Sequence, residues 1–313
     1  MKLFRLSLLT LAALLTILFN TGCGKKTSTV KLKKGQMLIY TSIQPMAFMT
    51  AKIAGQYAVV KALIPAGKSP HDFSPSPSQI GEMSKARLYF TTGLPLEEKL
   101  VIPALKDSTV QIVDTTAGIQ QLAVVCDKSC RCGQTKSSSG SVTSQVDRHV
   151  WLSPENNMII AKNIFDAITA ADPKHKDYYK LNFDNLIRCL KAVDQRLKKQ
   201  LEPHRGEIFL VYHPAFGYFA RQYNLKQEAV EFEGKKPSPA HLQAIINMAK
   251  EKNVHIIFVQ PQFNKKSAEV IAAEIQGKVV ELDPLAYNIL ENYTIIATSI
   301  QSAIKSEKTI ENK

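Results

Sequence analysis

The sequence lacks several motifs that would indicate catalysis or nucleic-acid binding. It contains no HExxH pair, which many zinc hydrolases use to hold their metal, and no Walker-type phosphate loop, which ATPases use to hold a nucleotide. No basic stripe is interleaved with aromatic residues, so nucleic-acid binding is not expected. Beyond the first apolar run, no segment is long and apolar enough to cross a membrane.

The composition that remains is that of a globular, basic protein. The chain has 313 residues, of which 45% are hydrophobic, and this length allows two domains. The formal net charge is +13, but it is spread as lysines over many segments and forms no single block. Such a spread is typical of a soluble basic surface, and attraction to anionic lipid is a second use for it.

The first residues resemble a bacterial lipoprotein signal. Lys2 and Arg5 precede an apolar run that is too short to span a bilayer, and the run is followed by Thr21-Gly22-Cys23. We expect residues 1–22 to be removed and Cys23 to carry the lipid. The alternative is a plain signal peptide cut elsewhere, because Asn20 stands where leucine is commoner. On either alternative we expect the protein to be exported.

The mature chain is expected to lie in the periplasm or on the cell surface, and the lipid on Cys23 would anchor it to a bacterial membrane. Residues 23–35 are polar and show no apolar periodicity, so they are interpreted as a tether. The cysteines also fit export, because disulfides form in oxidising compartments.

From residue 36 onward, strand-like and helix-like segments alternate, which predicts parallel α/β structure. The strands are expected at 37–41, 59–64, 88–92, 110–113, 208–212, 228–232, 255–259 and 279–282. Helices are expected between them, at 43–54, 76–85, 96–105, 216–223, 239–252 and 265–275, and a last one to about residue 304. The fold class is therefore α/β, with an N-terminal lobe at 36–172 and a C-terminal lobe at 204–313.

The segment 173–203 is expected to be one long helix that joins the two lobes. It contains neither glycine nor proline between its terminal prolines, and apolar residues recur at steps of four and three. These residues are Tyr179, Phe183, Leu186, Leu190, Val193 and Leu197. At 1.5 Å per residue such a helix is about 40 Å long, which is enough to span two lobes.

A stretch rich in serine and charge, 126–148, is expected to be a long mobile loop of the N-terminal lobe. It contains Cys126, Cys130 and Cys132, while the remaining cysteine is Cys189. The three loop cysteines could form a disulfide or collect a soft metal, and the pairing stays open.

Four residues lie at the ends of apolar segments and carry side chains that bind metals. They are His71, His149, His213 and Asp283, and three of them stand beside a proline. Ligands of open α/β sheets bind outside the carboxyl ends of strands, so these four can converge. Of the other histidines, His175 and His204 are expected to be exposed, and none of the rest is expected to bind the metal.

Three imidazoles and one carboxylate form a closed tetrahedral shell that suits zinc. The same donors can hold manganese or iron. A closed shell leaves no position for a reacting water, so we expect no enzyme activity, although an extracellular zinc hydrolase is the rival from that class.

At this point the chain resembles the ZnuA/TroA-like family, the metal-binding solute-binding proteins of ABC importers. Five segments carry the resemblance, in the same order as in the family and over nearly all of the mature chain. They are Pro65–Phe73, Asp147–Leu152, Tyr212–Phe219, Phe258–Phe263 and Leu282–Leu285.

The resemblance implies two α/β lobes bridged by a rigid helix, with a metal between them held by His71, His149, His213 and Asp283. It implies one Zn²⁺ or Mn²⁺ per chain as transported ligand, a monomer, and delivery to a permease driven by a separate ATPase. Manganese-type members often place a glutamate where this chain has His213, which favours zinc. A surface adhesin or scaffold with a structural metal is the second alternative.

Two departures from the family pattern stand out. Zinc-type members often carry a histidine-rich loop before the second ligand, where this chain has the three cysteines. Ser153 stands where an aspartate is common, and we expect this to change only a helix cap.

Overall fold

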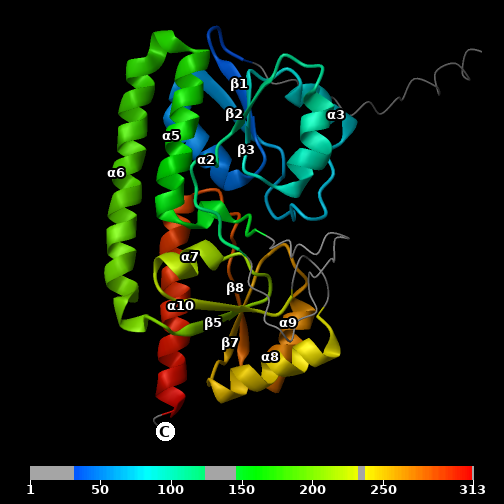
Figure 1. Ribbon diagram of the computed structural model, residues 1–313, viewed down its shortest axis with the longest axis vertical. Helices are drawn as coiled ribbons and strands as arrows, with labels where there is room; N and C mark the ends of the chain where they lie inside the picture. The colour runs from blue at the N-terminus through cyan, green and yellow to red at the C-terminus, as the bar shows by residue number, and fades with distance from the viewer. Residues whose placement is uncertain (1–31, 124–145, 232–236, 312–313) are drawn as a thin grey trace, which may run out of the picture. The chain divides into compact units, whose positions relative to one another are not determined.

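Two parallel sheets form the framework of this computed structural model, which describes residues 32–123, 146–231 and 237–311 (Figure 1). Each sheet has four strands. The first has the order β2-β1-β3-β4 and the second the order β6-β5-β7-β8, so the two lobes repeat one topology. All strand pairs are parallel, as the alternation of strands and helices predicted. The α/β fold class with two lobes is therefore confirmed.

The strands are short and keep close to their expected positions. They are β1 (Met37–Thr41), β2 (Ala58–Ala62), β3 (Leu88–Thr91), β4 (Gln111–Asp114), β5 (Ile208–Val211), β6 (Lys226–Ala229), β7 (Ile256–Val259) and β8 (Lys278–Glu281). All residues of β3 and β7 are buried, as is usual for inner parallel strands covered on both faces.

Helices cover the sheets. The longer ones are α2 (Gln44–Ala54), α3 (Pro77–Met83), α5 (Pro154–Ala171), α6 (Lys176–Leu201), α7 (Gly217–Gln222), α8 (Pro239–Glu251), α9 (Lys265–Glu274) and α10 (Ile289–Glu311). The short ones are α4 (Ile102–Leu105), η1 (Gly55–Tyr57), η2 (Glu97–Val101), η3 (Val150–Leu152), η4 (Pro173–His175) and η5 (Glu202–His204).

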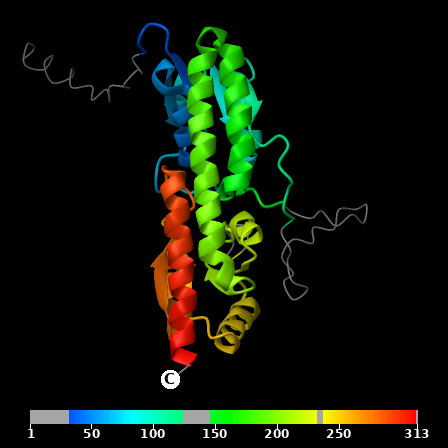
Figure 2. The same cartoon turned by 90° about the vertical axis from the view of Figure 1, so that its left-hand side faces the viewer.

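The expected long helix is present and connects the lobes. Two short 3₁₀ turns, η4 and η5, extend α6 at its ends, so that helical structure runs from Pro173 to His204. Helix α6 packs against α2 and α5 of the first lobe and against α10 of the second (Figure 2). Leu190 and Leu197 of the predicted apolar stripe are fully buried in these contacts.

One major helix, α5, was not predicted from the sequence. It has 18 residues, and Ile160, Ile164 and Ile168 are fully buried at a spacing of four. The periodic signal was therefore present between the loop and the linker helix. Ser153 is the N-cap of this helix, since its side chain accepts a hydrogen bond from the backbone N–H of Asn156. Ser153 is thus a helix cap as expected, but it does more than cap, since its hydroxyl also donates to Gln222 Oε1 at 2.6 Å.

Smaller differences also separate the structure from the sequence expectations. The expected helix at 96–105 is a π-helical turn followed by one short α-helical turn. Strand β6 begins two residues earlier than expected. The expectation that His204 is exposed was wrong, because its residue is 5% exposed. His175 is half-buried, since its ring stacks on Tyr57.

Several sequence expectations concern residues outside the described part of the chain. Cys23, the signal peptide, most of the tether and the three loop cysteines, Cys126, Cys130 and Cys132, lie there. Cys189 is described, and it is a free, exposed cysteine on α6. None of the helices within the described ranges is long and apolar enough to cross a membrane.

The packing of α6 gives a prediction for stability. We expect Leu190→Ala to lower the free energy of unfolding by about 2 to 5 kcal/mol, because it leaves a cavity where a fully buried side chain stood. The matched control is Leu181→Ala on the same helix. Leu181 is 60% exposed, so its truncation should cost less than about 0.5 kcal/mol. Urea unfolding of both variants checks this, and equal losses would contradict the packing described.

The start of the linker helix gives a pH prediction. Burial opposes ionisation of Asp172, but hydrogen bonds from His175 and Tyr179 prevail and hold the pKa of its carboxyl below the ordinary 3.8. A lowered pKa stabilises the fold above that ordinary value, and this stability is lost as pH falls through the folded-state pKa. We therefore expect Asp172→Asn to be less stable at neutral pH and to lose less stability on acidification below 3.8. Thermal unfolding of the wild type and of Asp172→Asn, from pH 7 down to acidic pH, measures how the stability of each depends on pH. The same loss of stability on acidification in both proteins would contradict this prediction.

Candidate metal centre

His71 reaches the site on a long loop of the first lobe. The loop runs from the end of β2 to α3 and contains prolines and a glycine at φ +76°. The Ser69 side chain accepts a hydrogen bond from the backbone N–H of His71, which fixes the turn there. A capping box between Ser76 and Gln79 begins α3 and closes the loop. His71 is exposed, and β2 ends at Ala62, two residues before the strand end that the sequence predicted.

His213 follows β5 of the second lobe and is buried. The side chain of Gln260 holds its backbone from both sides, since it accepts from the His213 N–H at 3.2 Å and donates to the His213 carbonyl at 2.9 Å. The ring of Phe263 stacks on the imidazole, with centroids 4.9 Å apart. The imidazole of His213 therefore has little freedom to turn away.

His149 does not end a strand, although the sequence interpretation placed it at the end of an apolar segment. It stands immediately before the 3₁₀ helix η3, and its neighbour Val146 forms an isolated antiparallel bridge with Ala123. The Asp147 carboxylate accepts the backbone N–H of His149 at 2.9 Å. This short polar turn, and not a strand, aims the imidazole of His149.

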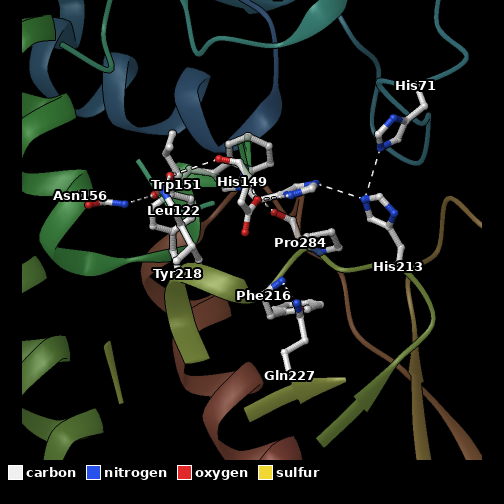
Figure 3. A network of polar contacts seen from close by, with 12 residues as sticks. His71, Leu122, His149, Trp151, Asn156, His213, Phe216, Tyr218, Gln227 and Pro284 are labelled. Carbon is white, nitrogen blue, oxygen red and sulfur yellow. Dashed lines mark hydrogen bonds and ion pairs between the residues drawn. The ribbon is translucent and has the colours of Figure 1, made fainter. Parts of the chain in front are cut away.

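The three imidazoles converge from segments far apart in the sequence. His71 Nε2 lies 3.3 Å from His213 Nε2, which in turn lies 3.2 Å from His149 Nε2 (Figure 3). One ring nitrogen from each histidine falls within 4.8 Å of the other two. Within the described residues this is the one group of three histidine, cysteine or acidic side chains close enough to hold a metal ion.

Carboxylates hold two of the imidazoles by their outer nitrogens. His149 Nδ1 donates to Asp147 Oδ1 at 2.8 Å, and His213 Nδ1 donates to Glu231 Oε1. Both carboxylates are buried, with Asp147 7% and Glu231 3% exposed. Because a carboxylate can only accept, each Nδ1 carries the hydrogen, and in the neutral imidazole this leaves the lone pair on Nε2, the nitrogen that faces the centre.

Burial keeps the lone pair of His213 available. Burial first, and then the nearby imidazoles of His149 and His71, hold the pKa of His213 well below its ordinary value. The imidazole of His213 is therefore neutral at physiological pH, which is the form that binds metals.

Converging lone pairs repel one another unless a cation lies between them. Zinc binds imidazole nitrogens at 2.0–2.1 Å, so two nitrogens at a tetrahedral angle are separated by about 3.3 Å. The separations of 3.3 and 3.2 Å at His213 match that value. The donor set and its spacing therefore fit a divalent transition metal.

Asp283, the fourth predicted ligand, follows β8 but does not belong to the group formed by the histidines. Its Oδ1 accepts two hydrogen bonds at 2.9 Å, one from the Gln262 side chain and one from the Leu285 backbone. The Asn292 side chain donates to the Asp283 carbonyl at 2.7 Å. The structure therefore brings together three of the four predicted residues. The fourth, Asp283, is held apart from them by hydrogen bonds to residues around it.

A hydrogen-bonded contact ties the second and fourth predicted ligand segments together. The indole N–H of Trp151 donates to the Pro284 carbonyl at 2.8 Å (Figure 3). The Tyr293 hydroxyl of α10 donates to the Trp151 carbonyl, and Asn157 of α5 donates to both that carbonyl and the Tyr293 hydroxyl. The side chains in this contact, Trp151, Asn157 and Tyr293, are fully buried. The contact therefore fixes the segments of His149 and Asp283 relative to each other.

Sequence reasoning missed the residues that support the ligands. It anticipated that carboxylates or carbonyls would hold the imidazoles, but it did not identify Asp147 or Glu231. Asp147 stands two residues before a candidate ligand, which is a usable signal. Glu231 is 18 residues from His213, and only the pairing of β5 with β6 brings it near.

Comparison with known proteins places these features in context. The pattern of the family described as "Zinc-uptake complex component A periplasmic" (ZnuA) matches residues 39–305. The high-affinity zinc uptake system protein ZnuA of Bacillus subtilis is 28% identical over 86% of this chain and 85% of its own length. The manganese ABC transporter substrate-binding lipoprotein PsaA of Streptococcus pneumoniae is 25% identical over 84% of each chain.

Solved structures share the fold. A crystal structure of ZnuA is 34% identical, covers 86% of this chain and 99% of its own, and superposes with a TM-score of 0.76. The laminin-binding protein Lmb of Streptococcus agalactiae, described as a bifunctional protein with adhesin and metal-transporting activity, is 26% identical. It covers 86% of this chain and 99% of its own, with a TM-score of 0.73.

The hydrogen bond between Glu231 and His213 gives a prediction for metal affinity. We expect Glu231→Gln to weaken zinc binding roughly 10- to 100-fold, because an amide holds the imidazole less firmly and lowers its basicity. Glu281→Gln is the matched control, since Glu281 is exposed and pairs with Lys265. Competition against a chelator of known affinity measures both variants. Unchanged affinity in Glu231→Gln would exclude a supporting role for this carboxylate.

Proposed function

We propose a function from one premise: the chain belongs to the ZnuA family of periplasmic zinc-uptake components, whose pattern covers residues 39–305. The protein captures a divalent transition metal outside the cytoplasmic membrane with high affinity. It then delivers the metal to the permease of an ABC importer, which a separate ATPase drives. The chain itself acts as the binding subunit of that importer and not as an enzyme.

The cargo site consists of His71, His149, His213 and Asp283, with one metal ion per chain. The observation that carries this assignment is the convergence of three imidazole nitrogens whose separations at His213 are 3.3 and 3.2 Å. Asp283 completes the shell by moving its carboxylate toward the histidines when the metal enters. Its segment is already tied to that of His149 through Trp151 and Pro284.

Zinc is the preferred cargo. Three neutral nitrogen donors and one oxygen suit the tetrahedral coordination of zinc, whereas manganese favours more oxygen ligands. Relatives named for zinc and for manganese are both similar to this chain, so similarity alone does not choose between them. The donor set therefore supports zinc first, with manganese as the second candidate and iron as the third.

The architecture supports a limited motion during release. We assign the N-terminal lobe to 36–172, the linker helix to 173–203 and the C-terminal lobe to 204–313. Because α6 packs against helices of both lobes, the lobes should shift only slightly when the metal leaves. A monomer suffices for this mechanism, since all four ligands come from one chain.

The lipid anchor belongs to the same proposal. Relatives are named as substrate-binding lipoproteins, and Thr21-Gly22-Cys23 resembles a lipoprotein signal. We assign the lipid to Cys23, which would hold the protein in the periplasm or at the cell surface beside its permease. Residues 23–35 would serve as the tether.

An adhesin role is the second candidate function. The one observation that favours it is the structural similarity to Lmb, which is described as both an adhesin and a metal transporter. Loss of metal uptake in cells without the protein would support transport. Loss of laminin binding with unchanged uptake would favour adhesion.

Metal content tests the proposed site. We expect protein purified without chelator to contain about one zinc per chain, and the His71→Ala, His213→Ala double variant to contain almost none, because two of the facing nitrogens are gone. Inductively coupled plasma mass spectrometry measures both. His241→Ala, a histidine on α8 outside the group, is the matched control and should retain its zinc.

Two other results of the metal analysis would change the interpretation. Manganese in place of zinc, again lost in the double variant, would keep the site and change the cargo. Equal metal in the wild type and the double variant would reject the ligand set, and Cys126, Cys130 and Cys132 would be tested next.

A further inference from the structure

The turn at Gln260–Phe263 contacts two of the candidate ligands at once. The Phe263 backbone N–H donates to the Gln260 carbonyl at 3.0 Å, which closes the turn directly after β7. From this turn, Gln260 and Phe263 hold His213, while Gln262 reaches Asp283. One turn therefore positions a nitrogen ligand and the oxygen ligand together.

The hydrogen bonds at Asp283 all fall on the same oxygen of its carboxylate. Oδ1 accepts the Leu285 backbone N–H at 2.9 Å and the Gln262 side-chain amide at 2.9 Å. The bond from Leu285 is an Asx turn, which the sequence Asp-Pro-Leu favours because the intervening proline has no N–H. The bond from Gln262 comes from a different strand end and is not required by the local sequence.

These two bonds decide how the carboxylate can bind a metal. A carboxylate oxygen has about two lone-pair directions, and both directions of Oδ1 are used. In the described residues, Oδ2 makes no hydrogen bond. The carboxylate can therefore pivot about Oδ1 and present Oδ2, whereas bidentate binding would displace one of the two hydrogen bonds at Oδ1.

We propose that Gln262 sets the preference of this site for zinc over manganese, by occupying Asp283 Oδ1 so that the carboxylate offers the metal one oxygen. This inference rests on the proposed function. One oxygen and three nitrogens make four ligands, which is the number that zinc takes in closed sites. Manganese favours a larger shell that is richer in oxygen, and a bidentate carboxylate would supply the additional ligand.

The backbone around Asp283 is fixed independently of Gln262. Asn292 donates to the Asp283 carbonyl at 2.7 Å, and Trp151 donates to the Pro284 carbonyl at 2.8 Å. Removal of the Gln262 amide should therefore leave the segment in place and free one direction of Oδ1. Gln262 is only half-buried in a turn, so its substitution should not prevent folding.

The test compares zinc and manganese affinities of purified, metal-stripped full chain in the wild type and in Gln262→Leu. Leucine keeps the approximate size of the side chain and removes the donor. We expect the ratio of manganese to zinc affinity to rise roughly tenfold, the change that follows from losing one hydrogen bond to a charged group. Competition titrations with each metal give the two affinities.

The visible absorption of bound cobalt(II) distinguishes a change in coordination number from a general loosening of the metal site. Cobalt(II) in a four-coordinate site absorbs visible light several times more strongly than in a five- or six-coordinate site. We expect intense bands in the wild type and weaker bands in Gln262→Leu, because the freed Oδ1 joins the shell.

Two control variants complete the design. Gln243→Leu makes the same chemical change at an exposed glutamine of α8 and should behave as the wild type. Asn292→Ala loosens the Asp283 backbone without touching its carboxylate, so it should weaken both metals alike and keep their ratio.

The proposal is overturned if Gln262→Leu binds zinc with an unchanged affinity ratio and unchanged cobalt bands. It is also overturned if Asn292→Ala shifts the ratio as much as Gln262→Leu does, since the effect would then be general loosening. A wild type that binds neither metal would instead reject the proposed function, and the wild-type titration alone identifies that case.

Discussion

The mutual repulsion of three imidazole lone pairs is the constraint on which the rest of this structure depends. The Nε2 atoms of His71 and His149 lie 3.3 and 3.2 Å from His213 Nε2, and lone pairs at these distances stay together when the rings are fixed from behind. Buried carboxylates hold the rings of His149 and His213 in this way. His213 is also held by the stacked ring of Phe263 and by hydrogen bonding of its backbone to Gln260. A cation between the nitrogens would relieve this repulsion, so the arrangement favours a bound metal ion.

Both lobes must also be held in register, because no single lobe contains the site. Helix α6 packs against each lobe, and the buried contact of Trp151 with Pro284 joins the segments of His149 and Asp283. A second, partly buried network connects them through α6, since Ser153 donates to Gln222, whose amide donates to Asp194. The cap residue that departs from the family pattern thus takes part in holding the lobes together.

Much of the fold follows from patterns that are local in the chain. Mostly apolar runs of four to six residues between turn residues located every strand, and steps of three and four located α6. The sequence interpretation missed α5 although local signals were present: Pro154 stands at its first position, and Ile160, Ile164 and Ile168 recur at a spacing of four. His204 was placed on the surface because its neighbours are charged, but the fold buries it, and Gln301 of α10 contacts its ring.

Sequence by itself determined the fold class, the family and the candidate ligands, because each depends on residue types at fixed spacings along the chain. Only the tertiary structure decided which ligands meet and what supports them. Glu231 reaches His213 because β6 pairs with β5, and Gln262 reaches Asp283 because β7 pairs with β8. Such contacts depend on strand pairing between segments far apart in the chain, and no local pattern of residues encodes the atom to which a side chain will bond.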